Sequence, residues 1–362
     1  MEIACCNFKK GGNLMKRLLA LVFVFLVIFS VIVSAQDYTF MVAFTDPPRL
    51  NIGEEKLIHV TPAAVNAFED AINRLTGGKF DVQFKPNGVL GSQVETIDQV
   101  EAGIIEATTP AVPALAGYFP DIQVLSIPYL FDNPAIAWEV LDGEFGQSLF
   151  NKMAKETGLR ILAIYDNGGY RNFSNNVRPI KGIEDMKGLK IRTMESPAQM
   201  EVVEALGGSP TPVAFSELYT ALQTGVVDGQ ENSPATVISG SLQEVQKYYT
   251  IDQHTLSLAA IVVNEGWYQG LPADIRAKVK VAGYVASVAG RGAAYSNNKI
   301  AMKFLEDSGV EIYSPTPEER SEFRQVAQRP VIQWMRSEDK IDNNLIDELL
   351  EAVDIATNKL GL

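Results

Sequence analysis

Two arginines beside predicted strands are placed to bind a carboxylate. Arg192 lies in the short strand predicted at residues 189–193, which leads into a helix. Arg171 follows the strand predicted at residues 159–165 and a flexible Gly168-Gly169 pair. Ligands of open α/β folds bind outside the carboxyl ends of strands, and a guanidinium can hold a carboxylate through two parallel hydrogen bonds. Without other information, a surface ion pair worth about 0–1 kcal/mol is the more ordinary explanation of each arginine.

The usual signatures of catalysis are missing from the sequence. There is no H-E-x-x-H, no P-loop, no G-x-G-x-x-G after a strand and no G-x-S-x-G. His59 and His254, the two histidines, have no nearby nucleophile pattern, so we interpret them as surface or packing residues. The acids at residues 339–348 lack the spacing of a calcium loop and are interpreted as a solvated helix face. A hydrolase with paired carboxylates remains an open alternative, although no spacing singles out a pair.

Composition narrows the classes of protein. The 362 residues are enough for two domains, and 46% hydrophobic with 21% charged residues is typical of a globular chain. The formal charge of −13 argues against nucleic acid and anionic membrane surfaces as partners. Two cysteines and two histidines argue against structural zinc, iron–sulfur clusters and a disulfide framework, so we expect no metal and no cofactor.

The first 35 residues have the layout of a secretory signal peptide. A basic start at residues 15–17 precedes 16 uncharged, mainly apolar residues, and Val33-Ser34-Ala35 places small residues before a cleavage point at Gln36. The alternative is a membrane anchor, but the apolar run is at or below the usual length of a span. Residues 1–35 carry a charge of +3 and both cysteines, so cleavage would leave 327 residues with a charge of −16. Residues 1–14 precede a possible start at Met15.

Helical and strand patterns alternate along the rest of the chain, which predicts a largely parallel sheet. Strands are expected at residues 38–44, 80–84, 104–107, 122–127, 159–165, 189–193, around 213, 226–227 and 256–263. Helices are expected at residues 61–76, 92–102, 134–150, 197–206, 216–223, 272–305 and 330–361, the last broken near 337–340.

The stretch at residues 272–305 is long for one helix. It contains no proline after residue 272, and 34 helical residues would span about 51 Å, more than the width of a small domain. One explanation is a helix that lies across both domains. The alternative is two helices broken at Gly290–Gly292.

The central part of the chain resembles a known family. The motifs are the runs 171–176 (RNFSNN), 184–192 (EDMKGLKIR), 207–212 (GGSPTP), 215–219 (FSELY), 221–225 (ALQTG) and 226–232 (VVDGQEN). This pattern resembles the solute-binding proteins of tripartite ATP-independent periplasmic (TRAP) transporters, the DctP-like family. The resemblance covers nearly all of residues 36–362.

The resemblance implies an α/β, two-domain periplasmic-binding-protein fold with a ligand cleft between the domains and a long helix spanning both. Residues 36–168 with 258–297 would form domain I, and residues 169–257 with 298–362 domain II. The implied protein is a monomeric, non-enzymatic periplasmic receptor. It closes on a small-molecule carboxylate and delivers it to a TRAP membrane permease. A receptor for another transport or sensory system is the alternative.

The resemblance also implies roles for particular residues. Arg192 corresponds to the main carboxylate anchor and Arg171 to a second basic contact at the same end of the ligand. Asn232 would donate its amide to that carboxylate, and Phe215 would form an apolar wall of the cleft.

Two residues of the first domain are expected to contact the far end of the ligand. Gln93 begins a helix near the cleft, and Thr109 lies where some relatives carry an acidic contact. Their polar groups suit hydroxyls, so a sugar acid is the expected ligand, with other carboxylates or ectoine as alternatives. Residues 45–60 form a longer, more charged first loop than is usual in the family.

Overall fold

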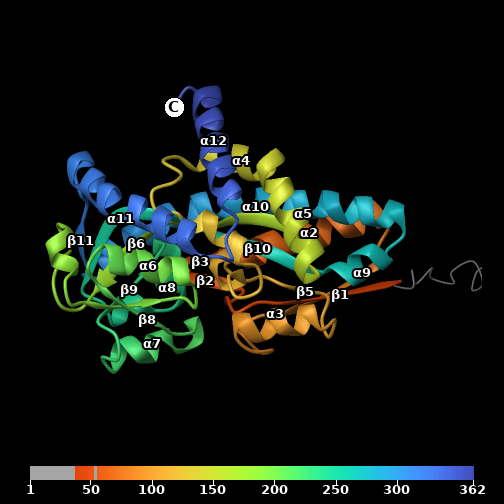
Figure 1. Ribbon diagram of the computed structural model, residues 1–362. Coiled ribbons are helices and arrows are strands. Elements are labelled where there is room, and N and C mark those ends of the chain that lie inside the picture. Colours follow the sequence, from red (N-terminus) through yellow and green to blue (C-terminus); the bar gives the residue numbers. More distant parts are fainter. Residues whose placement is uncertain (1–36, 53–54) are drawn as a thin grey trace, which may run out of the picture.

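The computed structural model describes residues 37–52 and 55–362, so the expected signal segment lies outside the described residues. Two lobes lie side by side around one mixed sheet (Figure 1). The strand order is β4-β1-β5-β10-β6-β9-β7-β8, with β11 paired to β10. The strands are β1 (Tyr38–Ala43), β2 (Arg49–Ile52), β3 (Glu55–Ile58), β4 (Phe80–Lys85), β5 (Ala107–Thr108), β6 (Leu159–Asn175), β7 (Lys190–Thr193), β8 (Ser209–Pro212), β9 (Gly229–Asn232), β10 (Tyr248–Asn264) and β11 (Glu311–Tyr313).

Helices cover this sheet in both lobes (Figure 1). The α-helices are α2 (Val60–Thr76), α3 (Gln93–Glu101), α4 (Pro134–Asp142), α5 (Glu144–Thr157), α6 (Pro197–Ala205), α7 (Phe215–Gln223), α8 (Pro234–Ser239), α9 (Glu265–Gly270), α10 (Ala273–Asp307), α11 (Pro317–Ser337) and α12 (Asn343–Leu360). Short 3-10 helices are η1 (Val112–Leu115), η2 (Pro120–Ser126), η3 (Ile183–Met186) and η4 (Leu242–Glu244).

Two long antiparallel strands join the lobes. β6 and β10 are each 17 residues long and pair along most of their length. Five of the eight strand pairings described in this sheet are parallel, as expected, but these long strands introduce antiparallel pairs at β6–β10, β6–β9 and β5–β10. Gly168 and Gly169 interrupt β6 with φ values of 104° and 96°, which favour glycine. The register of β10 shifts between Thr250 and Thr255 and again between Leu256 and Leu258, opposite this interruption.

The long helix expected across both lobes is present as one continuous element. α10 has 35 residues and packs on α2 in one lobe and on α8 in the other. Its glycines do not break it, so the alternative of two helices is wrong. Gly283 and Gly290 instead allow a close approach to β6: a Cβ at Gly283 would lie 2.3 Å from the carbonyl oxygen of Leu162, and one at Gly290 would lie 2.8 Å from the ring of Tyr165.

This close packing predicts opposite effects for two glycines of the same helix. Gly292→Ala, which meets nothing within 4 Å, is expected to raise stability by about 0.5–1 kcal/mol through helix propensity. Gly283→Ala is expected to lower stability by about 1–3 kcal/mol, because the backbone of β6 must move. Thermal unfolding of the two variants measures the difference. A stabilised Gly283→Ala variant would contradict the packing of α10 on β6.

Several element predictions need correction. The run at residues 122–127 is no strand: residues 122–126 belong to the 3-10 helix η2, and Ile127 follows it. A buried apolar run alone does not distinguish the two structures, and Pro120 begins a helical turn. The strand expected at residues 104–107 is the two-residue β5. The helix expected at residues 134–150 is divided into α4 and α5 at Gly143, and α11 begins at Pro317 and continues through Pro330.

The first loop contains a hairpin that reaches the other lobe. β2 and β3 pair antiparallel within residues 45–60, where the sequence predicts only an extended polar loop. Leu50 and Ile52 of β2 are buried in a cluster with Leu218, Ala235 and other residues of the second lobe. The longer loop therefore joins the two lobes through apolar packing.

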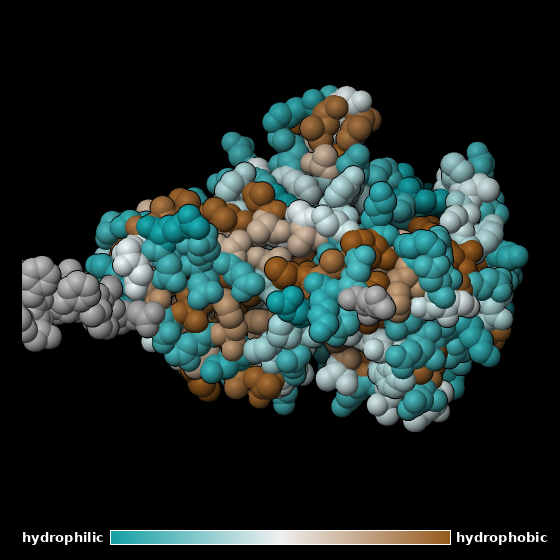
Figure 2. Space-filling view, turned by 180° about the vertical axis from the view of Figure 1, so that it is seen from behind, coloured by the Kyte–Doolittle hydropathy of each residue, from teal (hydrophilic) through white to brown (hydrophobic). Residues whose placement is uncertain are grey.

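The last helix crosses back over the molecule. α12 contacts α4, α5 and η2, which belong to residues 36–168, although the sequence grouped residues 298–362 with the second domain. Its end projects from the body, and apolar side chains gather on it, as Figure 2 shows. Ile355 and Leu362 on this projecting end are each 60% exposed.

Candidate functional site

Arg192 is a buried cation without a charged partner. It lies in β7, between β8 and β9, and its side chain is 2% exposed. Its Nε donates to the carbonyl oxygen of Val213 at 2.7 Å, but among the described residues its two Nη atoms have no hydrogen bond and no carboxylate forms an ion pair with it. Burial lowers the pKa of Arg192 to about 10, so the group stays charged at neutral pH. Glu231 offsets only part of this burial, and a buried charge with no carboxylate in direct contact is costly unless an anion joins it.

The Arg192 side chain opens into a cavity between the lobes. The cavity has a volume of only about 20 Å³, but it continues into a wider cleft of about 800 Å³, which is within the usual size of small-molecule sites. The first lobe contributes Thr45, Ser92, Gln93 and Ala114; the second contributes Arg192, Met194, Glu195, Ala214, Phe215 and Ser216. We call this space the Arg192 cavity.

Gln93 approaches the Arg192 cavity from the first lobe. It is the first residue of α3, whose start is fixed by a capping box between Ser92 and Glu95. The Gln93 Oε1 atom accepts a hydrogen bond from the backbone nitrogen of Ala111 at 3.0 Å. Because its oxygen is held in this way, the side chain is oriented with its amide group available as a donor.

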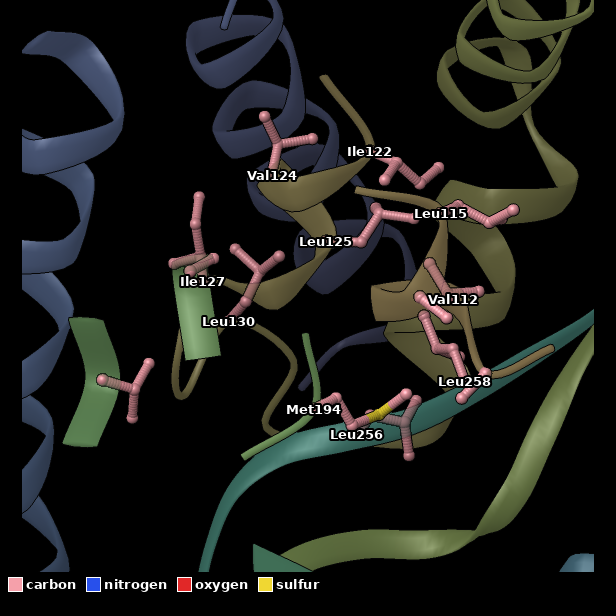
Figure 3. Packing of buried hydrophobic residues seen from close by; sticks show 14 of the residues in the cluster. Val112, Leu115, Ile122, Val124, Leu125, Ile127, Leu130, Met194, Leu256 and Leu258 are labelled. Carbon is pink, nitrogen blue, oxygen red and sulfur yellow. The ribbon is translucent and has the colours of Figure 1, made fainter. Parts of the chain in front are cut away.

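Apolar side chains form the other walls. Phe215 begins α7 and lines both the Arg192 cavity and the wider cleft. Met194 follows Arg192 by two residues and packs beside Leu256, in the same apolar cluster as Val112 and Leu258 (Figure 3). These residues belong to one cluster that continues across both lobes. Met194, Phe215, Ala114 and Ala214 thus give the cavity an apolar part beside its polar lining.

Arg171 lies beside this site in a buried ionic network. Its guanidinium, 3% exposed, binds both carboxylate oxygens of Glu231, with Nη2 to Oε1 at 2.7 Å. Glu231 also contacts His254 Nε2 at 3.2 Å, and His254 Nδ1 is 2.8 Å from Asp252. The remaining Nη1 of Arg171 is 3.5 Å from the hydroxyl of Ser257. Arg171 therefore has a charged partner within the protein, whereas Arg192 has none among the described residues.

The network shifts the pKa values of its members in opposite directions. Burial would lower the pKa of His254, but the Asp252 and Glu231 carboxylates outweigh it and raise the pKa to about 9. Burial would raise the pKa of Glu231, but Arg171 and His254 lower it to about 2. His254 is therefore a charged member of a buried network, and its interpretation as a surface or packing residue is incomplete.

The structure brings three of the six predicted site residues into one cavity: Arg192, Phe215 and Gln93. Arg171 instead lines a separate, smaller space of about 10 Å³ with Ser257. Asn232 lies in β9 and donates its amide to Gln230 at 2.5 Å, and Thr109 is buried beside β1, where its nitrogen donates to Ala43. Neither lines the Arg192 cavity.

Residues that the sequence did not single out complete the lining. Met194 and Glu195 directly follow Arg192 and Thr193, at the carboxyl end of β7, so their nearness to a strand end is the signal that could have found them. Ser92 and Ser216 are neighbours of predicted site residues at the starts of α3 and α7. Within residues 37–52 and 55–362, no group of three or more metal-ligating side chains could hold a metal ion. No helix in this part of the chain combines the length and apolar character needed to span a membrane.

Residues 54–338 match the family described as bacterial extracellular solute-binding protein, family 7, known as DctP. The chain belongs to this family. The C4-dicarboxylate-binding periplasmic protein DctP of Rhodobacter capsulatus is 34% identical over 264 residues, which are 72% of this chain and 78% of that protein.

Solved structures of TRAP solute-binding proteins share the fold. The sugar acid binding protein DctPAm from Advenella mimigardefordensis, in complex with galactonate, is 28% identical with a TM-score of 0.80, over 89% of this chain and 99% of that one. A TRAP periplasmic solute-binding protein from Sulfitobacter sp. NAS-14.1 with bound β-D-galacturonate is 29% identical with a TM-score of 0.77, over 87% and 99%. These matches confirm the DctP family resemblance and the two-domain fold with a ligand cleft. Members of the family are periplasmic solute-binding proteins of transport systems.

Proposed function

We propose that this DctP protein is the receptor of a TRAP transporter and captures a sugar acid through the ligand's carboxylate. The observation that carries the proposal is the unpaired Arg192 guanidinium, which is buried at the inner end of a cavity between two lobes. A carboxylate would form a bidentate, charge-assisted pair with its Nη atoms. Arg171, Asn232 and Thr109 are proposed to move toward the ligand, or to support its contacts, when it binds.

The polar lining supports a hydroxylated ligand. Thr45, Ser92, Gln93 and Ser216 surround the cavity with hydroxyl and amide groups, which can hydrogen-bond sugar hydroxyls. Two similar structures contain galactonate and galacturonate. An apolar acid would leave these groups unpaired, which favours a sugar acid over an aliphatic acid.

Transport requires release as well as capture. We propose that the lobes close by rotation about a hinge where Gly168 and Gly169 interrupt β6 and the register of β10 shifts. This hinge would separate domain I (residues 36–168 with 258–297) from domain II (residues 169–257 with 298–362). The closed, monomeric receptor would then deliver its ligand to the membrane permease and catalyse no reaction. Cleavage after residue 35 would release it into the periplasm.

Calorimetric titration of the purified protein tests the proposal. D-galactonate and D-glucuronate are expected to bind, whereas galactitol, which lacks the carboxylate, is expected to give no heat of binding. Binding by galactitol, or the absence of binding by every sugar acid tested, would overturn the sugar acid assignment. Uptake of the bound acid by cells that express this protein together with a TRAP permease tests the transport role separately.

A further inference from the structure

Charge is distributed unevenly along the cleft. Arg192 provides the positive charge at the inner end. The wider cleft outside it is lined by Glu95, Glu195 and Glu217, and no lysine or arginine is among its lining residues. A ligand anchored by a carboxylate at Arg192 would therefore extend toward negative charge.

Glu195 is the acid at the junction of the two spaces. It lines both the Arg192 cavity and the wider cleft, three residues after the anchor itself. Its side chain is exposed, and no hydrogen bond or ion pair to it is found in the described part of the chain. Glu95, in contrast, accepts the backbone nitrogen of Ser92 at 2.7 Å in the capping box of α3. Glu195 is therefore free to contact a ligand.

The charge of the Glu195 carboxylate affects the pKa values of residues in both lobes. It is close enough to raise the pKa of Arg192, although burial lowers that pKa by more. It also adds to the effects of burial and Asp98, which raise the pKa of Tyr118 in the first lobe. Its charge therefore acts on Arg192 in the second lobe and on Tyr118 in the first.

We propose that Glu195 restricts this receptor to monocarboxylates, an inference that rests on the proposed role of Arg192 as the carboxylate anchor. A hydroxyl at the far end of the ligand can donate a hydrogen bond to Glu195. A second carboxylate at that end can donate none, and it would face Glu195 with no cation in the lining of the outer cleft to compensate it. Like charges placed close together weaken binding of the dicarboxylate even where every other contact is kept. The protein therefore differs in specificity from its C4-dicarboxylate-binding relative.

Matched pairs of acids test this inference. Galactonate and galactarate carry the same hydroxyls at C2 to C5 and differ only at C6, which is a hydroxymethyl group in the first and a carboxylate in the second. Succinamate and succinate form a second pair on a four-carbon chain, in which a neutral carboxamide in the first replaces one carboxylate of the second. Within a pair of acids that the wild-type protein binds, the monoacid is expected to bind at least about tenfold more tightly than the diacid. Glu195→Gln is expected to reduce this ratio to about threefold or less, mainly by tighter diacid binding.

Glu204→Gln is the matched control, because it removes the same charge from an exposed position of α6 away from the cleft. It is expected to leave both affinities unchanged. Equal binding of monoacid and diacid by the wild type, or an equal effect of the two variants, would overturn the role of Glu195. If succinamate binds in preference to succinate and galactonate does not bind, the sugar acid proposal fails and the role of Glu195 stands. If no acid binds, both fail.

Discussion

Replacing Arg192 by methionine is expected to weaken binding of the carboxylate ligand by about 3–5 kcal/mol, or roughly two to four orders of magnitude in Kd. The reason is the loss of a charge-assisted, bidentate pair in a cavity where the ligand carboxylate would then lack a cation. Calorimetric titration with galactonate measures the loss. An unchanged affinity would contradict the assignment of Arg192 as the anchor.

The same substitution is expected to leave the ligand-free protein as stable as the wild type or more stable. Arg192 is buried and no carboxylate among the described residues forms an ion pair with it, so its removal relieves a burial cost that exceeds the effect of the nearby Glu231 charge. Arg192→Lys is the second variant: it keeps the charge but lacks the planar fork, and it should recover only part of the affinity. Thermal unfolding without ligand separates these effects from misfolding.

Local patterns predicted the fold where neighbouring residues determine it. The length of α10 follows from a stretch free of proline, and the capping box at Ser92 marks the start of α3. The continuation of β6 to Asn175 could not be predicted in this way, because that segment is a strand through pairing with β9 and β10, far along the chain. The same limit applies to η2, whose residues are buried on all sides by other elements.

The site was predictable to the extent that its residues lie at element ends. Arg192 ends a strand, and Gln93 and Phe215 begin helices, so pattern and family resemblance both point to them. The contact of Arg171 with Glu231 joins residues 60 positions apart in sequence. No local pattern records such a pairing, and the sequence therefore suggests Arg171 as a ligand contact without indicating that the protein supplies its counter-ion.

Loss of Glu231, the counter-ion of Arg171, is expected to have the second large effect, a decrease in stability. Glu231→Gln would leave Arg171 buried and unpaired, and breaking a buried pair in this way costs about 3–5 kcal/mol of unfolding free energy. Glu184→Gln is the control, because Glu184 pairs with Lys187 on the surface and its loss should cost about 0–1 kcal/mol. Urea unfolding of both variants measures the contrast, and equal costs would contradict a structural role for the Arg171–Glu231 pair.

The pH dependence of stability is a second readout of the same network. The pKa of His254 is raised to about 9 from an ordinary value of 6.5, so its contribution is complete below pH 6.5 and is lost as the pH rises toward 9. The pKa of Glu231 is lowered to about 2 from 4.5, so its contribution is complete above pH 4.5 and is lost as the pH falls toward 2. The wild type should therefore be most stable between about pH 4.5 and 6.5. Glu231→Gln should lose less stability on acidification, because no carboxylate remains at this position to be protonated, and a profile unchanged from that of the wild type would contradict the assignment.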